Sequence, residues 1–341
     1  MESKRPTLKD LALETGVSKQ SISLILNGSR KYPYSEETTR KVFEATKRLG
    51  YKANRAAQSV RKGCFNTIGL LLKNDEFWID LPKPVIKGVE DVFRKENYNT
   101  VHIKLKAESF NKIGVESGFM SENMIDGLII GYENDSLATP CGTIEDSRAP
   151  IIWVNRKVDY NSVRPDDESA ARKITEILLD LGHRRILYAN YSHTDHYSST
   201  DRLLSYEKTM IKAGLTPWTF CGYVPREKRI EKSREFLDRA DRPTAIIAYG
   251  GTTALPFMLS FTDLYGLKIP EQLSIVSFGG PVDDSTGLAL STIEYNEETI
   301  GRESAKMLLR RILSGGAPEP SIVVTPSKIL GNTCAQAPVV T

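Results

Sequence analysis

The chain has 341 residues, of which 40% are hydrophobic, so it is long enough for more than one packed core. No apolar run approaches the roughly 18 residues of a membrane-spanning helix, and the first residues lack a charged-then-apolar leader, so we expect a cytoplasmic protein. Residues 1–63 hold fourteen Lys and Arg against six Asp and Glu, whereas the remainder holds thirty-two against thirty-seven. The basic first segment indicates binding to a polyanion.

A first helix is predicted from residue 8. Leu8 and Leu11 recur at helical spacing, and Thr7 precedes them with Asp10 three residues later, which is the pattern of a capped helix start. Gly16 is expected to end this helix and to begin a tight turn.

A second helix follows, with Ser18 as its cap. Three apolar residues recur at spacings of three and four and should face inward: Ile22, Ile25 and Leu26. Four residues are left off the buried face: Lys19, Gln20, Ser23 and Leu24. Two short amphipathic helices around a tight turn are typical of a helix-turn-helix, so we expect these four side chains to meet the major groove of DNA.

A third helix is predicted to start after Ser35, because Glu36 and Glu37 suit the positive end of the helix dipole. It continues through Val42 and ends before Gly50. Three helices would make one compact headpiece over residues 1–50. A plain amphipathic bundle is the alternative, and the basic surplus favours DNA binding.

The chain resembles the LacI family of bacterial transcription regulators. The resemblance is carried by TLKDLALETGVSKQSISLILNG and YSEETTRKVFEATKRLGYKANRAAQSVRKG, and then by TIGLLLKN, IDGLIIG, LGHRRI, RPTAIIAY, IPEQLSIVSFGG and LSTIEYNEETIGRESAKMLL in the family's order. It spans residues 5 to about 330.

The resemblance implies that Lys19, Gln20 and Leu24 read bases. Lys19 can donate to guanine, Gln20 can pair with adenine, and Leu24 can only touch an apolar edge such as a thymine methyl. The family usually has Arg where Leu24 stands, so we expect a shifted operator sequence. Four polar side chains are expected to hold phosphates: Thr7, Ser18, Ser23 and Asn27.

Residues 51–65 resemble the family's hinge helix, which folds in the minor groove when two subunits meet on DNA. The family normally inserts a Leu where this chain has Val60, and Gln58 replaces a frequent Arg. The shorter Val60 should unstack the central base step less effectively. The alternative is a simple linker.

The body alternates apolar runs such as IGLLL, GLIIG and SIVSF with helical stretches, which predicts βαβ units and parallel sheets. The fold class is therefore α/β: an all-α headpiece followed by a two-lobed core of doubly wound parallel sheets, which the resemblance makes periplasmic-binding-protein-like. The expected core covers 66–330, with a first lobe of 66–163 plus 296–329, a second lobe of 164–295, and a tail of 331–341.

Ligands of such folds bind beyond the carboxyl ends of the strands, so residues that follow the strands are the predicted effector contacts. They are Phe77, Trp78, Arg156, Asp166, Tyr191, Arg202, Gly251 and Gly279. Arg202 matches the family's ligand-contacting Arg, and its planar fork suits vicinal hydroxyls or a carboxylate. A surface salt bridge is the alternative role for this side chain.

Family members that bind neutral sugars commonly carry Asp at two strand ends where this chain has Gly251 and Gly279. An acidic or phosphorylated effector is suggested by the loss of these two Asp residues, by the Gly-Gly helix start and by the nearby Arg156 and Arg202. Asp166 would oppose an anion. A neutral sugar held differently, or a site without a ligand, therefore stays open.

We predict a homodimeric transcription repressor that reads a near-palindromic operator under the control of a small-molecule effector. Motifs of an enzyme are missing, so no catalytic residue or cofactor is expected. The four scattered cysteines and the loop pair His193 and His196 suggest neither a disulfide nor a metal site. An exported solute-binding protein and a general nucleoid binder are the rival functions, the latter distinguished by equal affinity for any duplex.

Overall fold

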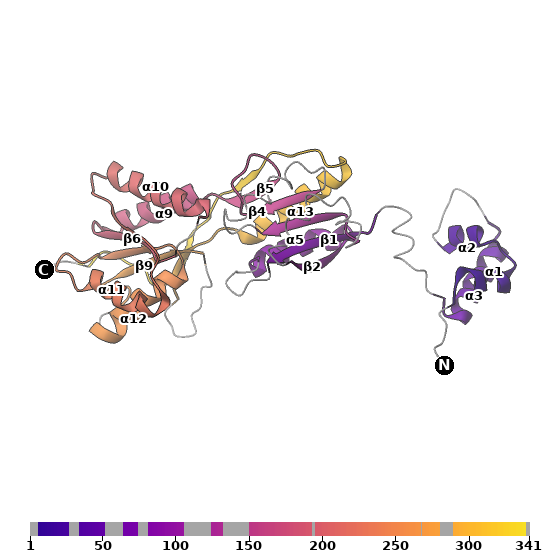
Figure 1. Cartoon of the computed structure of the whole chain (residues 1–341), viewed down its shortest axis with the longest axis horizontal. Coiled ribbons are helices and arrows are strands. Elements are labelled where there is room, and N and C mark those ends of the chain that lie inside the picture. Colours follow the sequence, from indigo (N-terminus) through magenta and orange to yellow (C-terminus); the bar gives the residue numbers. More distant parts are fainter. Residues whose placement is uncertain are drawn as a thin grey trace. The chain divides into compact units, whose positions relative to one another are not determined.

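The computed structural model describes residues 6–26, 34–51, 64–73, 81–105, 124–131, 150–192, 195–266, 268–279 and 289–338. The chain divides into two compact units, Met1–Phe65 and Asn66–Thr341 (Figure 1). The predicted hinge helix, with Val60, lies outside the described residues. In the described part of the chain, no helix is both long and apolar enough to cross a membrane.

The first unit contains the three predicted helices, α1 (Leu8–Thr15), α2 (Lys19–Leu26) and α3 (Glu36–Leu49). Thr7 and Asp10 form the predicted capping box of α1, and Gly16 ends that helix in the left-handed region with φ 70°. Ser35 caps α3 through the Thr38 amide. The helices pack through five buried apolar residues: Leu11, Ile22, Ile25, Val42 and Ala45.

The second unit holds two six-stranded sheets, which form the two predicted lobes of a mostly parallel α/β core. The first sheet has the order β11-β5-β4-β3-β1-β2 and is parallel throughout. Its strands are β1 (Thr67–Lys73), β2 (Asn99–Leu105), β3 (Gly127–Gly131), β4 (Ile151–Val154), β5 (Ser162–Pro165) and β11 (Ile322–Val324). Helices α5 (Lys83–Lys95) and α13 (Glu297–Leu313) share one hydrophobic core with these strands.

The second sheet has the order β12-β10-β9-β8-β6-β7, and only the edge strand β12 runs antiparallel to its neighbour. Its strands are β6 (Ile186–Asn190), β7 (Trp218–Cys221), β8 (Ala245–Ala248), β9 (Ser274–Phe278), β10 (Ser291–Ile293) and β12 (Ile329–Leu330). Helices α9 (Asp167–Asp180) and α10 (Tyr197–Lys212) pack in one core, and α11 (Arg229–Leu237) and α12 (Gly251–Tyr265) pack in another. Both sheets are flanked by helices in Figure 1, so each lobe has the layered architecture that positions ligand sites at strand ends.

The chain passes between the two sheets three times: between β5 and α9, between β10 and α13, and between β11 and β12. The predicted tail needs a correction, because residues 331–338 are bonded into the second lobe. Thr333 exchanges hydrogen bonds with Ser291 (2.7 and 3.0 Å) and donates its hydroxyl to the Ile275 carbonyl (2.6 Å). Unpaired backbone groups at the end of a sheet need such partners. The core therefore extends past residue 330.

Helices α5 and α13 touch through two glycines. A Cβ atom added to Gly88 would lie 2.2 Å from the Glu298 carbonyl oxygen, and one added to Gly301 would lie 2.1 Å from the Val85 carbonyl oxygen. The absence of side chains at these two positions allows the backbones to come close, and it fixes where α13 begins relative to α5.

Gly301→Ala should destabilise the second unit by about 3 kcal/mol or more, because the new methyl group meets backbone atoms that cannot move aside without separating α5 from α13. Urea unfolding followed by circular dichroism measures the change. Gly250→Ala is the matched control, since nothing lies within 4 Å of a Cβ atom there. Equal midpoints for the two variants would contradict the close-contact interpretation.

Candidate functional site

The outward face of α2 is the first candidate site. Lys19 and Gln20 are exposed and Leu24 is half-buried, whereas Ile22 and Ile25 point into the headpiece core. The predicted base-reading side chains therefore lie on the face of α2 that does not pack against α1 and α3. That is the arrangement a recognition helix needs, because only such side chains can enter a groove.

The predicted phosphate contacts have structural roles in the headpiece. The Thr7 hydroxyl donates to Asp10 (2.8 Å), and the Ser18 hydroxyl donates to Ser21 (3.0 Å) while accepting from the Ser21 amide (3.1 Å). A phosphate at either position would have to share or replace these bonds. Asn27 lies outside the described residues, and the phosphate roles stay predictions.

The second candidate site is a pocket of about 330 Å³ where the two lobes meet. Gly279 follows β9 and Pro84 lies at the start of α5, so both lobes contribute to its wall. The remaining lining residues come from β10, the following crossing segment, the first turns of α13 and β12: Thr292, Ile293, Glu294, Tyr295, Asn296, Glu297, Glu298, Thr299, Arg302 and Leu330. Of the described residues predicted to contact an effector, Gly279 is the one that lines this pocket. Phe77 and Trp78 lie outside the described residues.

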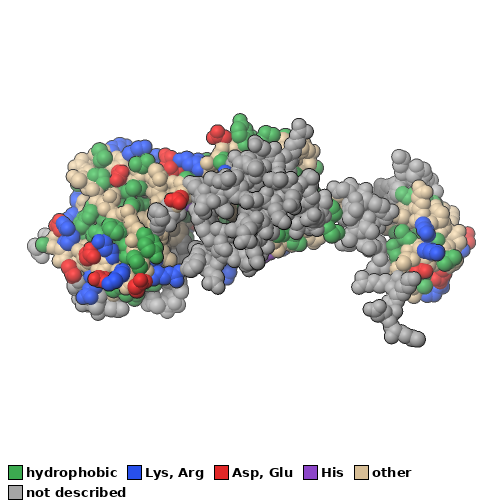
Figure 2. Space-filling model, viewed as in Figure 1, with side chains coloured by type: hydrophobic (Ala, Val, Ile, Leu, Met, Phe, Trp, Pro, Cys, Tyr) green, Lys and Arg blue, Asp and Glu red, His purple; other side chains and the backbone are tan. Residues whose placement is uncertain are grey.

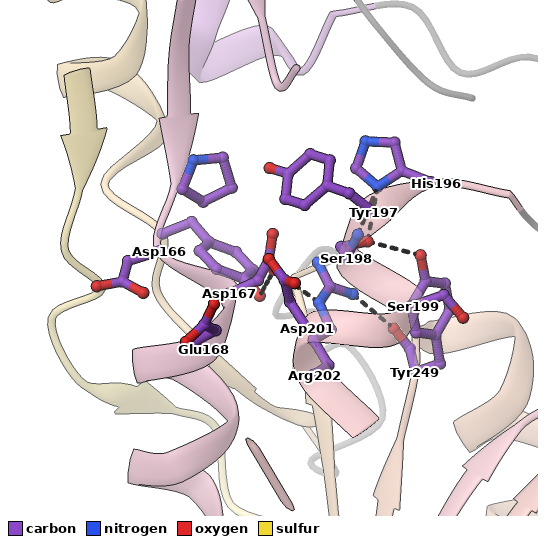
Figure 3. A network of polar contacts seen from close by, with 12 residues as sticks. Asp166, Asp167, Glu168, His196, Tyr197, Ser198, Ser199, Asp201, Arg202 and Tyr249 are labelled. Carbon is purple, nitrogen blue, oxygen red and sulfur yellow. Dashed lines mark hydrogen bonds and ion pairs between the residues drawn. The ribbon is translucent and has the colours of Figure 1, made fainter. Parts of the chain in front are cut away.

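Figure 3 shows the buried ion pair between Arg202 and Asp167, which Tyr295 connects to this pocket. Arg202 on α10 donates from Nε to Oδ1 of Asp167, the first residue of α9, over 2.7 Å. Tyr295, which lines the pocket, donates its hydroxyl to the same oxygen over 2.8 Å. Arg202 also donates to the Tyr249 carbonyl (3.2 Å). The sequence prediction missed Asp167 as the partner of Arg202, although an acidic residue at the start of a helix after a strand was visible.

Aromatic rings surround the guanidinium group of Arg202. Its Cζ lies 4.8 Å from the ring centroid of Tyr249, 4.6 Å from that of Phe278 and 5.5 Å from that of Tyr295. Burial alone would lower the pKa of Arg202, but the Asp167 carboxylate and these tyrosines raise it well above its ordinary value. Arg202 is therefore permanently charged, and the Asp167 carboxylate balances its charge inside the protein.

The prediction that Tyr191 contacts an effector is wrong. Its side chain is fully buried in the core beneath α12, where it stacks on Phe257 and bonds through its hydroxyl to Ser233 (3.0 Å). A side chain that follows a strand can point toward the ligand site or into the helix layer that covers the sheet. The aromatic ring of Tyr191 takes the second direction because burial in the core stabilises it. The sequence pattern did not distinguish these two orientations.

Three other predicted effector contacts lie elsewhere or are buried. Asp166 caps α9 through the Ser169 amide (3.0 Å) and lines a separate surface groove between α9 and α10. Gly251 is exposed at the start of α12 and is not part of the pocket lining. Arg156 is buried with its guanidinium group 4.5 Å above the Trp153 ring. Neither arginine that suggested an anionic effector extends freely into the pocket.

Polar contacts join the segment after β4 to the start of α10. His196 bonds through Nε2 to the Asn155 carbonyl (3.1 Å), and the Tyr197 hydroxyl donates to the Asn155 side chain (3.0 Å). Lys157 pairs with Asp201 at 2.7 Å. These contacts connect the two lobes beside the buried ion pair. Within the described ranges, no three His, Cys, Asp or Glu side chains gather into a metal site.

Comparison with known proteins agrees with both units. Residues 7–54 match the family described as bacterial regulatory proteins, lacI family, and residues 175–334 match a periplasmic binding protein-like domain. The chain is 25% identical to the HTH-type transcriptional repressor PurR of Edwardsiella ictaluri over 97% of this chain and 98% of that protein. It is 24% identical to the PurR repressor of Photobacterium profundum over 90% and 92%, respectively.

The chain therefore combines a LacI-family headpiece with a periplasmic-binding-protein-like domain. Among solved structures, the lac repressor dimer bound to operator and the anti-inducer ONPF gives a TM-score of 0.79 at 21% identity, covering 97% of this chain and all of that one. A transcriptional regulator CelR–cellobiose complex gives 0.64 at 21% identity, covering 96% and 100%. These structures support the predicted fold, and the lacI-family match over residues 7–54 supports a DNA-binding headpiece.

Arg202→Met should destabilise the second unit by about 3–5 kcal/mol, because it leaves the Asp167 carboxylate buried without its cation. Chemical unfolding measures the loss. The double variant Arg202→Met with Asp167→Asn should recover part of the stability, since no uncompensated charge remains.

The control for this prediction is Lys228→Met. It breaks the exposed pair with Glu231 and should change stability by less than about 1 kcal/mol. If Arg202→Met lowers the free energy of unfolding by no more than this control does, Arg202 is not what stabilises the buried Asp167 carboxylate.

Proposed function

We propose that this chain is a transcription repressor that binds a near-palindromic operator as a homodimer, and that a small molecule held between the lobes sets its operator affinity. The observation that carries the proposal is the headpiece, a matched lacI-family domain with Lys19 and Gln20 exposed on α2. The solved lac repressor with the same fold is a dimer bound to operator. A second copy would present a second α2 to the other half-site.

The chemistry of the exposed face of α2 sets the expected operator contacts. Lys19 can donate to O6 and N7 of guanine, and Gln20 can form a bidentate pair with adenine. Leu24 offers only apolar contact, which suits a thymine methyl group. Val60 remains the proposed minor-groove wedge and lies outside the described residues.

Mixed surface charge on the core is consistent with DNA contacts concentrated in the headpiece. Figure 2 shows Lys and Arg side chains interspersed with Asp and Glu over the face of the second lobe in view. A duplex would gain little from such a surface, since positive and negative groups cancel beyond about 10 Å at moderate salt. The fourteen basic residues among residues 1–63 are the larger source of affinity.

Gln20→Ala should weaken binding to the operator by about 1–3 kcal/mol and relax discrimination at one base pair. Operator selection from a random duplex library, followed by fluorescence anisotropy on matched and mismatched duplexes, measures both effects. Lys41→Ala is the control, because it removes an exposed charge from α3 and should affect all duplexes alike. Equal weakening of every duplex by Gln20→Ala would favour a nucleoid-type binder.

The homodimer needs an apolar contact surface, and α12 offers one. Leu255 and Leu259 lie one turn apart on this helix and are 53% and 39% exposed, and Ile230 on the neighbouring α11 is 44% exposed. The Ile230 carbonyl accepts from Ser260 of α12 (3.4 Å), so α11 and α12 are in contact. Exposed apolar side chains on two touching helices would favour association with a second copy.

Leu255→Glu should convert the dimer to monomers, because the carboxylate would lose its hydration in the interface. Sedimentation velocity measures the state, and operator affinity should fall with it since one headpiece reads one half-site. Leu313→Glu, at the exposed end of α13, is the control and should stay dimeric. A Leu255→Glu dimer would place the interface elsewhere.

The proposal includes no catalytic activity and no cofactor. The relatives named above are repressors, and binding and release of DNA need no reacting group. The operator lies on the chromosome, so the cytoplasm is the proposed location. The small-molecule effector belongs in the pocket between the lobes, where a ligand could favour one lobe arrangement by about 1–3 kcal/mol.

A further inference from the structure

Two side chains in the pocket between the lobes lack partners. The Thr292 hydroxyl on β10 is buried, with the residue 4% exposed, and makes no hydrogen bond. Glu297, the first residue of α13, lines the same pocket and makes no hydrogen bond or ion pair within the described part of the chain. Buried polar groups are normally bonded, so the unbonded Thr292 hydroxyl indicates a missing partner, and the half-buried carboxylate of Glu297 beside it offers a charge to the same ligand.

Several other polar side chains of the pocket wall are already engaged. Glu298 pairs with Lys87 (2.7 Å) and with Arg302. Glu294 accepts from the Ser327 hydroxyl, and the Asn296 amide donates to the Thr325 carbonyl (2.9 Å). Arg302 is thus the cationic residue among those that line the pocket, and it forms an ion pair with Glu298. Glu294 and Glu297 are the lining carboxylates without a cation partner in the described wall, and Glu297 also lacks a hydrogen bond, whereas Glu294 accepts one from Ser327.

The carboxyl group of Glu297 is in an unfavourable position when ionised. Partial burial raises its pKa, because the charged form loses hydration. The positive end of α13 offers some compensation, and Glu298 in the same turn shares it. A cation in contact with Glu297 would stabilise the ionised carboxylate and so offset the hydration that burial removes.

An anionic ligand fits this wall poorly. It would approach the carboxylate of Glu297 in a partly dehydrated site, where like charges repel strongly. Arg202 is paired with Asp167, and Arg156 is buried against Trp153. The groups that suggested an acidic effector from the sequence are therefore engaged within the protein.

We infer that the pocket binds a small molecule bearing an ammonium group, with Glu297 as the partner of that group and Thr292 as the acceptor or donor for a neighbouring polar atom. The volume of about 330 Å³ suits an amino sugar or a short amine and is at the small end of ligand sites. This inference rests on the proposed function, since it names the chemical class of the effector.

A panel of amines with matched derivatives tests the inference on the full chain. Glucosamine and 1,4-diaminobutane are compared with N-acetylglucosamine and N,N′-diacetyl-1,4-diaminobutane, which carry no cation, and with glucose and glucosamine 6-phosphate, by thermal shift and then by calorimetry. At least one amine should bind, and acetylation of its ammonium group should weaken binding about tenfold or more. Binding of the acetylated or neutral compound with equal affinity, or of no amine at all, would overturn the inference.

Variants of the pocket separate binding from folding. Glu297→Gln should weaken the amine about tenfold or more, whereas Glu303→Gln, which breaks an ion pair with Lys306 on the same helix, should not. Thr292→Val should leave unfolding unchanged, because the hydroxyl has no bond to lose, and should still lower affinity. Full amine affinity in both Glu297→Gln and Thr292→Val would refute the assigned contacts.

Operator binding distinguishes failure of this inference from failure of the proposed function. If an amine binds through Glu297 and leaves operator affinity unchanged, the ligand class stands and the effector role fails. If no amine binds and Gln20→Ala still relaxes operator discrimination, the DNA-binding function stands and the ligand class is wrong.

Discussion

The buried pair between Asp167 and Arg202 constrains the structure around the pocket. A carboxylate at the start of α9 and a guanidinium group on α10 have both left water, and each is stable there only because the other is present. Tyr295 bonds to the same carboxylate and belongs to the segment that carries the chain from β10 to α13. One interaction therefore links two helices of the second lobe to a crossing between the lobes.

This constraint also decides the character of the ligand site. Arg202 is paired with Asp167 and enclosed by aromatic rings, so this ion pair adds no net charge beside the pocket. The proposed ligand contacts are therefore Thr292 on β10 and Glu297 at the start of α13, which lack hydrogen-bond partners in the described part of the chain. The glycines that replace the family's carboxylates thus do not make the site basic. The carboxylate of Glu297 lies in the pocket wall instead, which is why the ligand proposed above carries a positive charge.

Local signals made the headpiece predictable. Thr7 with Asp10, Ser35 and Gly16 act over three or four residues, so the sequence alone places the ends of α1 and the start of α3. The alternation of apolar runs and helical stretches likewise predicted two parallel sheets. The pocket was less predictable, because pairs such as Asp167 with Arg202 join residues that only tertiary packing brings together. Tyr191 follows a strand as expected, and the aromatic core, not its sequence position, decides its direction.

The hydrogen bonds that hold residues 331–338 in the second lobe affect the order in which the two lobes can fold during synthesis. Neither lobe is a continuous piece of chain: the second contains β6 to β10 and then β12 with Thr333, after α13 and β11 have completed the first. During synthesis, the last bonds of the second lobe can therefore form only after α13 and β11 of the first lobe have been made. Chains cut short near residue 320 would lack the final strand of both sheets, and the exposed sheet edges would invite aggregation.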